Sequence, residues 1–292
     1  MFDSIKTLNK FYPLNTLCRV LNVNKSSYLY WLHFGDINKQ EFIEFCLLVL
    51  KIYYDNKGIY GAPKITIILN NLGVICSQSK VSRTMSVLGI RSIVSKRFPH
   101  RLSSMTLEEK SLIVNLIKDL NVTSINQVWT TDITYIKTIN EGTFYLITYI
   151  DYFSKRVVSW GLFKDQKTDK LIIVLTRAIK FRKPTPGLIC HSDKGSQMRS
   201  KVYRQFLSEY NFVFSYTSLN HSCDENASQE SFHASLKKEY LYQMKLYTFE
   251  DAYKAIFDYI EGFYNPIRIH SSIGYLSPIE YEKRTTLRWY PL

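Results

Sequence analysis

The order of strand-like and helix-like segments between residues 126 and 264 constrains the fold more than any other feature of the chain. Three segments rich in Thr, Tyr, Ile and Val, at 128–137, 144–151 and 156–163, are separated by turn residues and predict an antiparallel meander. The segments that follow are a helix at 169–181, a short apolar strand at 187–191, a helix at 201–210, a strand at 212–216 and a helix at 226–240. This alternation predicts an α/β domain built on a mixed sheet.

Three carboxylates occupy positions that this order of elements can bring together. Asp132 lies in the first strand, Asp193 follows the fourth strand, and Glu230 lies in the helix after the fifth strand. The order is that of a ribonuclease-H-like domain with five strands and flanking helices, in which the first and fourth strands are neighbours and the late helix packs beside them. The three acids can therefore converge.

Converged carboxylates predict a particular chemistry. Without a cation they repel and raise one another's pKa, whereas hard divalent cations such as Mg²⁺ accept oxygen ligands of this kind. Two such ions about 3.5–4 Å apart can activate an attacking oxygen and stabilise a leaving oxygen in an in-line phosphoryl displacement. The pattern predicts metal-dependent phosphodiester hydrolysis or transesterification.

The charge of the chain indicates a polyanionic partner. Lys and Arg number 38 against 25 Asp and Glu, which gives a formal charge of +13. Eight basic residues and no acid lie between Asp55 and Glu108. This run surrounds two short apolar-striped helical segments, ended by Gly73 and Gly89, that match a helix-turn-helix DNA-binding unit. A solvated basic face is the alternative interpretation of the same run.

Changes in periodicity divide the chain into five regions. Thr106 and Glu109 form a capping-box pattern, which predicts a connecting helix before the strands begin. The predicted regions are an N-terminal helical region at 1–55, a helix-turn-helix region with a basic linker at 56–104, a connecting helix at 105–125, the catalytic core at 126–245, and a C-terminal helix and tail at 246–292.

Several classes of protein are disfavoured by the same sequence. No apolar run reaches the roughly 18 residues of a membrane span, and the N-terminus lacks the layout of a secretory signal. The five cysteines form no CxxC pair, so neither a disulfide framework nor a structural zinc site is supported. We expect a soluble cytoplasmic protein without a membrane partner.

Short motifs spread through most of the chain carry a resemblance to one family. They are Leu17-Cys18-Arg19-Val20-Leu21, Tyr60-Gly61-Ala62-Pro63-Lys64, Val81-Ser82-Arg83, Trp129 with Asp132-Ile133-Thr134-Tyr135, Asp151-Tyr152-Phe153-Ser154, His191-Ser192-Asp193, Gly195-Ser196-Gln197, Asn226-Ala227, Glu230-Ser231-Phe232, Tyr264-Asn265, Arg268, His270 and Leu276-Ser277-Pro278. In this order they resemble an insertion-sequence transposase of the IS-three family, of the OrfB type, with a DDE retroviral-integrase-like catalytic core.

The resemblance implies roles for the three acids and for the whole protein. Asp132, Asp193 and Glu230 would be the catalytic metal ligands for two Mg²⁺ ions, with Mn²⁺ as a possible substitute. The protein would bind the terminal inverted repeats of an insertion sequence, cut there, and join the released 3′-hydroxyl to target DNA. It would act on double-stranded DNA as a multimer, together with or fused to an OrfA-type upstream protein, in a prokaryotic cytoplasm at the nucleoid.

Basic residues near these elements are the candidates for DNA contact. Lys237 lies seven positions after Glu230, so the two share a helical face and Lys237 could hold a phosphate near the scissile bond; a solvated lysine is the alternative. Arg268 is a candidate only through the resemblance. The full set is Lys64, Lys80, Arg83, Arg91, Lys96, Arg97, Lys194, Lys237, Lys238 and Arg268.

Departures from the family pattern leave a second function open. Glu225, Met198 and His221 stand where the family usually has Asp, an aromatic residue and Gly. A catalytically weak or inactive DNA-binding regulator of transposition is therefore the alternative. A nuclease acting on RNA–DNA hybrids is disfavoured by the basic N-terminal helical region, which suits duplex DNA. Since no sustained heptad pattern is present, we expect multimerisation to require the upstream protein or DNA.

Overall fold

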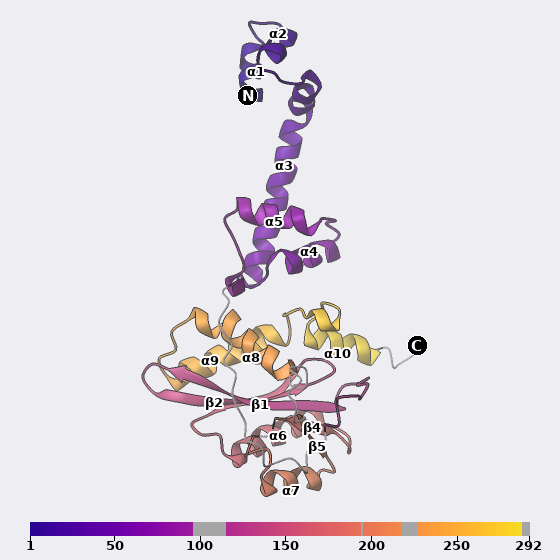
Figure 1. The fold of residues 1–292 in the computed structure, drawn as a ribbon, viewed down its shortest axis with the longest axis vertical. Coiled ribbons are helices and arrows are strands. Elements are labelled where there is room, and N and C mark those ends of the chain that lie inside the picture. The colour runs from indigo at the N-terminus through magenta and orange to yellow at the C-terminus, as the bar shows by residue number, and fades with distance from the viewer. Residues whose placement is uncertain (96–114, 194, 218–226, 288–292) are drawn as a thin grey trace. The chain divides into compact units, whose positions relative to one another are not determined.

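The computed structural model describes residues 1–95, 115–193, 195–217 and 227–287, except for the side chains of residues 33–39, 95 and 287 (Figure 1). The chain forms two compact units, Met1–Lys96 and Arg97–Leu292, each of which is described by itself below. Among the described residues, no helix has the length and apolar character needed to cross a membrane.

The N-terminal unit is helical, as predicted. Helices α1 (Phe2–Leu8) and α2 (Leu14–Val20) pack with the first turns of the long helix α3 (Lys25–Asp55) around a small core that contains Ile5 and Tyr28. Helix α3 begins at Asn24, whose side-chain oxygen accepts hydrogen bonds from the backbone of the first turn. This short N-terminal bundle therefore holds one end of α3.

The other end of α3 carries the predicted helix-turn-helix pair. Helices α4 (Ala62–Asn71) and α5 (Gln78–Val87) are followed by the short helix η1 (Ile93–Ser95). The chain leaves the two helices at Gly73 and Gly89, which have φ values of +84° and +65° and so adopt the left-handed conformation that glycine accommodates. Phe45, Val49 and Ile52 of α3 are buried in this half of the unit.

The second unit contains the predicted five-stranded mixed sheet, and this prediction is confirmed. The strand order is β3-β2-β1-β4-β5, in which β1 pairs antiparallel with β2 and parallel with β4. Strands β2 and β3 are antiparallel, and β4 and β5 are parallel. The strands are β1 (Val128–Thr138), β2 (Gly142–Asp151), β3 (Val157–Phe163), β4 (Ile189–Ser192) and β5 (Val213–Tyr216).

Helices cover both faces of this sheet. On one face α6 (Thr168–Arg182) and α7 (Lys201–Glu209) enclose the main apolar core, which includes Trp129 and Tyr149. On the other face α8 (Ala227–Glu239) lies against β1 and β2, because Gln229 bonds to both strands. The chain continues through η2 (Leu241–Gln243), α9 (Phe249–Tyr259), a π-helical turn at Ile260–Tyr264 and η4 (Ser271–Ile273).

Two predictions outside the sheet need correction. Residues 105–114 of the predicted connecting helix lie outside the described residues, and residues 115–125 form turns and bends, so the helix does not reach that far. The predicted C-terminal tail is instead largely helix α10 (Pro278–Leu287). Its start has recognisable capping chemistry, since the Ser277 hydroxyl accepts from the Glu280 N–H and Pro278 is in the first turn.

A buried ion-pair cluster attaches α10 to the sheet. The Glu282 carboxylate accepts two hydrogen bonds from the Arg182 guanidinium, at 2.7 and 2.8 Å, and one from Arg156 at 2.6 Å. Ser154, in the turn after β2, donates to both Glu282 and Asp151. The two arginines lower the pKa of Glu282, so its carboxylate stays charged in this cluster.

The cluster predicts a large difference between two glutamates of α10. Glu282→Ala removes the carboxylate that both arginines share and leaves Arg182 with only Asn126 and, at 3.8 Å, Asp151, so we expect a loss of about 3–5 kcal/mol in the free energy of unfolding, measured with urea. Glu280→Ala removes only the exposed pair with Arg284, worth about 0.3–0.5 kcal/mol, and is the matched control. Equal effects of the two substitutions would contradict this account of the cluster.

Candidate active site

The pairing of β1 with β4 brings the first two predicted acids together. The two strands run parallel, and their last paired residues are Thr131 and Ser192. Asp132 follows Thr131 on β1 and Asp193 follows Ser192 at the end of β4, so the two acids lie side by side on neighbouring segments. Burial, and to a smaller extent the negative charge of Asp132, raise the pKa of Asp193, as expected for a partly buried carboxyl group beside a second one.

Hydrogen bonds fix one oxygen of each acid. Asp132 Oδ1 accepts from the backbone N–H of Ile133 at 2.8 Å, and Asp193 Oδ1 accepts from Gly195 N–H at 3.0 Å. Gly195 also permits the close approach of this loop, because a Cβ there would lie 3.1 Å from Asp193 Oδ1 and 3.0 Å from Met198 Sδ. Met198, one of the departures from the family pattern, is buried in the apolar core.

Helix α8 lies along β1 in a regular register. Every fourth residue of the helix meets every second residue of the strand: Gln229 bonds to Thr130, His233 approaches Asp132, and Lys237 bonds to Thr134. The match follows from geometry, because four helical residues rise about 6 Å and two strand residues about 6.7 Å. The register aligns polar side chains of α8 with the strand that carries Asp132.

His233 is the member of this register that reaches the acid itself. Its Nδ1 lies 3.4 Å from Asp132 Oδ2, and its Nε2 lies 3.4 Å from Thr148 Oγ1 on β2. The imidazole therefore bridges the acid and the neighbouring strand. Asp132 keeps about one fifth of its side chain exposed, so the carboxylate is still open to a ligand.

Lys237 lies on the same side of the sheet as Asp132. Its ammonium donates to Thr134 Oγ1 at 2.7 Å and lies 4.5 Å from the centroid of the Tyr135 ring. Burial lowers the pKa of Lys237, and the negative charge of Asp132 partly offsets this shift. The ammonium of Lys237 therefore interacts electrostatically with the Asp132 carboxylate. The alternative of a fully solvated lysine is therefore not supported.

The third predicted acid is less closely engaged. Glu230 lies in the first turn of α8 and is exposed, and the described residues contain no group of three His, Cys, Asp or Glu side chains arranged to hold a metal. Its direction is nevertheless constrained: Glu230 and Lys237 lie about 20° apart around the helix. The structure thus brings Asp132 and Asp193 together, while Glu230 follows Gln229 on α8 and does not complete a three-acid cluster among the described residues.

Other candidate residues have structural partners. His191 is buried and its Nδ1 lies 2.9 Å from Ser215 Oγ on β5. Asp151 accepts from the backbone of Phe153 and Ser154, so it stabilises the turn that follows β2. Neither residue is oriented by these contacts toward Asp132.

Arg268 requires a correction. Its guanidinium donates two hydrogen bonds to the Glu239 carboxylate, at 2.6 and 2.8 Å, and a third to Ser235, and its side chain is 12% exposed. Both partners belong to α8. These contacts occupy the guanidinium, so the structure assigns Arg268 to the interior beside α8 rather than to a DNA-facing surface.

The remaining basic candidates fall into three sets, one of which lies outside the described residues. Lys64, Lys80, Arg83 and Arg91 belong to the helix-turn-helix part of the N-terminal unit, where the Lys80 ammonium lies 4.3 Å from the Phe45 ring centroid. Lys238 follows Lys237 on α8 and is half-buried. Lys96, Arg97 and Lys194 lie outside the described residues.

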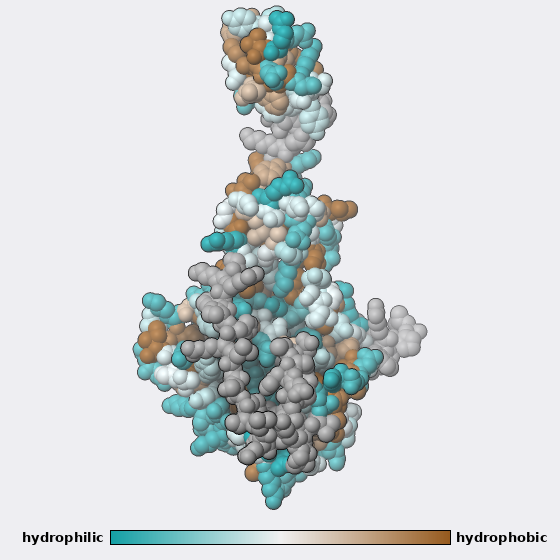
Figure 2. All heavy atoms as spheres, viewed as in Figure 1, coloured by the Kyte–Doolittle hydropathy of each residue, from teal (hydrophilic) through white to brown (hydrophobic). Residues whose placement is uncertain are grey.

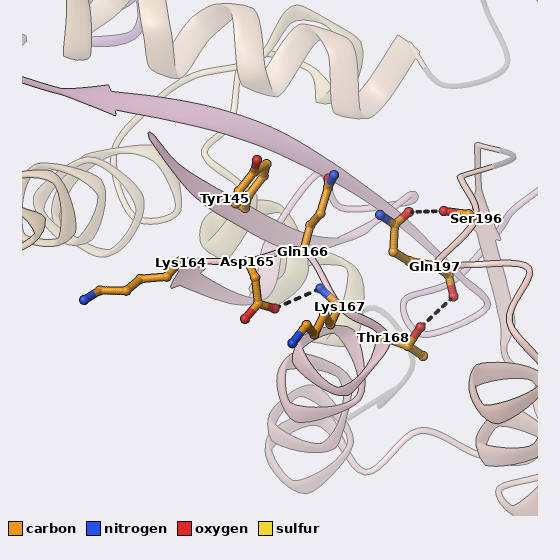
Figure 3. Close-up of a pocket in the computed structure, with 8 residues that line it drawn as sticks. All are labelled: Tyr145, Lys164, Asp165, Gln166, Lys167, Thr168, Ser196 and Gln197. Atoms are coloured by element: carbon orange, nitrogen blue, oxygen red, sulfur yellow. Dashed lines mark hydrogen bonds between the residues drawn. The ribbon is translucent and has the colours of Figure 1, made fainter. Parts of the chain in front are cut away.

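A polar cavity of about 460 Å³ opens beside the loop that follows Asp193 (Figure 3). It is lined by Ser196 and Gln197 of that loop, by Tyr145 of β2, by residues 164–167 between β3 and α6, and by Thr168, the first residue of α6. Within it Asp165 caps the backbone of Lys167, and Thr168 Oγ1 lies 3.5 Å from the Gln197 carbonyl. With two lysines and a single carboxylate, this cavity does not have the ligand set of a metal site.

Gln229 is the important residue that the sequence analysis missed. It is fully buried; its Oε1 accepts from Thr148 Oγ1 at 2.8 Å and its Nε2 donates to the Thr130 carbonyl at 2.7 Å. The signal was present in the sequence, since Gln229, His233 and Lys237 recur every four residues along a face that also carries Phe232 and Leu236. Such a polar stripe within an apolar helix face indicates polar partners on the sheet.

Three family matches cover most of the chain. Residues 123–222 match a family described as Integrase core domain, and residues 230–286 match a second family with the same description. Residues 44–98 match a family described as HTH-like domain. The two integrase matches cover the sheet and its flanking helices, and the third covers α4, α5 and the end of α3.

Curated relatives match over nearly their whole length. The transposase for insertion sequence element IS904 of Lactococcus lactis is 35% identical over 80% of this chain and 90% of its own. The transposase InsF for insertion sequence IS3A of Escherichia coli is 31% identical over 94% of this chain and 95% of its own. Among solved structures, the HTLV-2 integrase catalytic core domain in complex with magnesium is 19% identical, with a TM-score of 0.42 over 55% of this chain and 97% of that chain.

The hydrogen bonds of Gln229 predict a specific cost for removing them. Gln229→Met keeps the length of the side chain and its helix propensity but leaves Thr130 and Thr148 without their amide partner, so we expect a loss of about 2–3 kcal/mol in the free energy of unfolding by urea. Gln243→Met, at an exposed position in η2, is the control and should change it by less than about 0.5 kcal/mol.

Proposed function

The chain belongs to the insertion-sequence transposases with an HTH-like domain and an integrase core, so its function is DNA transposition, and from that premise we propose that it binds the terminal inverted repeats of its element and catalyses metal-dependent strand cleavage and strand transfer there. As a DNA-cleaving transferase of this family, it would join the 3′-hydroxyl of the cut element end to a target phosphodiester.

The observation that carries the proposal is the placement of Asp132 and Asp193 next to each other, each directly after the last residue pair of two adjacent parallel strands. Burial and the neighbouring charge of Asp132 raise the pKa of Asp193, so a cation bound between the two carboxylates would favour their charged forms. Mg²⁺ commonly binds through one or two carboxylates, with water and substrate phosphate as its other ligands. The pair therefore fits a hard divalent cation, and Mn²⁺ suits the same oxygen donors.

The roles of the side chains follow from this fit. Asp132 and Asp193 would hold the metal, Glu230 would join them when DNA binds, and His233 would orient Asp132. A bound Mg²⁺ would lower the pKa of the attacking water or 3′-hydroxyl and stabilise the leaving oxygen. Lys237, held near Asp132 by Thr134, would bind a phosphate next to the scissile bond.

Recognition of the element ends would be separate from this chemistry. The helix-turn-helix unit, with Lys64, Lys80, Arg83 and Arg91, would bind duplex DNA, and its cations would give the binding its salt dependence. An OrfA-type upstream protein or fusion would contribute to recognition, and the active species would be a multimer on DNA.

One observation favours a second function. Glu230 is exposed and does not complete a cluster of three acids among the described residues. A copy in which this glutamate never reaches the metal would bind element ends without cutting them and would act as a DNA-binding regulator. Nicking of a labelled element end by the wild-type protein with Mg²⁺ would exclude this alternative.

The repulsion between the two acids predicts opposite effects of one substitution on activity and on stability. Asp193→Asn should lower Mg²⁺-dependent nicking and joining by at least about a hundredfold, because it removes a metal ligand, while binding of the element end survives. Without metal, the same variant should be more stable than wild type by on the order of 1 kcal/mol, since a like-charge contact is lost.

Thermal unfolding with and without Mg²⁺ checks this directly. Wild type should be stabilised by added Mg²⁺, whereas Asp193→Asn should not respond. Equal nicking by the variant, or an equal response of its unfolding temperature to Mg²⁺, would remove Asp193 from the mechanism.

The position of Lys237 predicts a measurable change in salt dependence. Lys237→Met should reduce the slope of log affinity for the element end against log salt by about 0.9, since one phosphate contact is lost. Lys238→Met, one position along α8, should leave the slope closer to wild type. The reverse order of the two effects would assign the phosphate contact to Lys238 instead.

A further inference from the structure

Helix α3 carries an exposed apolar stripe along its last three turns. Ile43, Leu47 and Tyr54 are 42%, 60% and 67% exposed, and Leu50 between them is half-buried. Their spacing of four, three and four residues is the a/d spacing of a coiled coil, here limited to two heptads. In the space-filling view, brown apolar patches lie among teal and white surface over the N-terminal unit (Figure 2).

The stripe is distinct from the part of α3 that supports the helix-turn-helix pair. Phe45, Val49 and Ile52 are nearly fully buried, and they lie on the opposite side of the helix from Leu47. Substitution within the stripe should therefore not disturb the packing of α4 and α5. Isolated exposed apolar residues need no explanation, but four at coiled-coil spacing form a continuous surface.

The charged residues beside the stripe indicate which kind of surface would bind it. Glu44 and Lys51 flank the same edge of the stripe, seven residues apart. Among the described residues neither forms an ion pair within its own chain, and Glu44 accepts only a hydrogen bond from the neutral Gln40 amide, at 3.2 Å. A surface with an acid near one end and a base near the other is complementary to itself when reversed. Such a pattern is what a twofold-symmetric interface requires, in which residue i meets residue j and j meets i.

We propose that this stripe, made of Ile43, Leu47, Leu50 and Tyr54, binds the same stripe of a second copy of the chain as a short antiparallel coiled coil. With the two helices antiparallel, Leu47 faces Leu50 of the second copy, and Ile43 faces Tyr54. The same arrangement brings Glu44 beside Lys51 of the second copy on each side of the axis. The interface joins two helix-turn-helix units, so the dimer presents two DNA-binding units together.

The size of the surface sets the strength of the association. A stable interface buries about 800 Å² on each partner, from 20–30 residues, whereas this stripe has four apolar residues and their flanks. The dimer is accordingly weak in free solution and depends on concentration. Two copies held on neighbouring element ends would associate more readily, because tethering raises their effective concentration.

The self-complementary charges allow a test with two charge-reversal variants: each alone should dimerise less, and a mixture of the two should dimerise like wild type. In sedimentation experiments on the full chain over a concentration series, Glu44→Lys places Lys against Lys51, and Lys51→Glu places Glu against Glu44. Each variant alone should dimerise about tenfold more weakly than wild type. An equimolar mixture of the two has both charge pairs restored in the heterodimer and should recover wild-type association.

A second pair of variants tests the apolar part of the interface. Leu47→Lys should abolish the dimer, whereas Leu72→Lys, at a position 66% exposed outside the stripe, should not change it. Both residues are exposed, so thermal unfolding should be unaffected and loss of the dimer would not reflect misfolding.

Two outcomes would overturn the proposal. A wild-type chain that stays monomeric at every concentration, with or without a duplex carrying two element ends, would show that α3 does not pair with itself. A dimer that mixing of the charge variants does not restore would show that another surface forms it. Neither measurement uses catalysis, so this proposal can fail while the proposed strand-transfer activity stands.

Discussion

The parallel pairing of β1 with β4 is the constraint on which the candidate site depends. It sets Asp132 and Asp193 at the same level on adjacent strands, where their carboxylates repel. Parallel pairing requires a crossover connection, and the segment from β3 through α6 to β4 supplies it while covering one face of the sheet. The apolar core under α6 and α7 therefore holds two like charges together, and its burial energy compensates for a contact that is unfavourable without a cation.

The opposite face of the sheet is organised by polar contacts instead. Gln229, Thr130, Thr148 and His233 form a connected network in which each amide or hydroxyl has a partner. A satisfied buried network adds less stability than an apolar contact of the same size but fixes one register, because a shift of α8 along β1 would leave several of these groups unsatisfied. For α8, which carries the potential metal ligand Glu230, a single fixed position on the sheet matters more than additional stability.

The sequence was sufficient to predict the sheet and the two aspartates, because strand periodicity and the order of elements are local signals. The order of neighbouring strands and the helices that cover the sheet follow from the same signals. The predictions that were wrong concern α10 and Arg268, and both depend on contacts between residues distant in sequence. Helix α10 is held by Arg156 and Arg182, and Arg268 is bound by Glu239, and neither pairing has a local pattern. Whether Glu230 joins the aspartates likewise depends on how α8 meets the sheet, so its role stays a prediction.

The contacts of Arg268 show that the C-terminal segment helps to hold α8 in place, which a DNA-binding tail would not do. Gln229 attaches the first turn of α8 to the sheet, and Arg268 attaches the last turn through Glu239, so the helix is held at both ends. The segment that supplies Arg268 is itself anchored, since the Asn265 amide bonds to both backbone groups of Val157 on the edge strand β3. Edge-strand groups that would otherwise be open to another chain are thereby used to position α8. The second integrase match, which runs from Glu230 to residue 286, covers the whole of this connection, so the end of the chain belongs to the same structural unit as the acids.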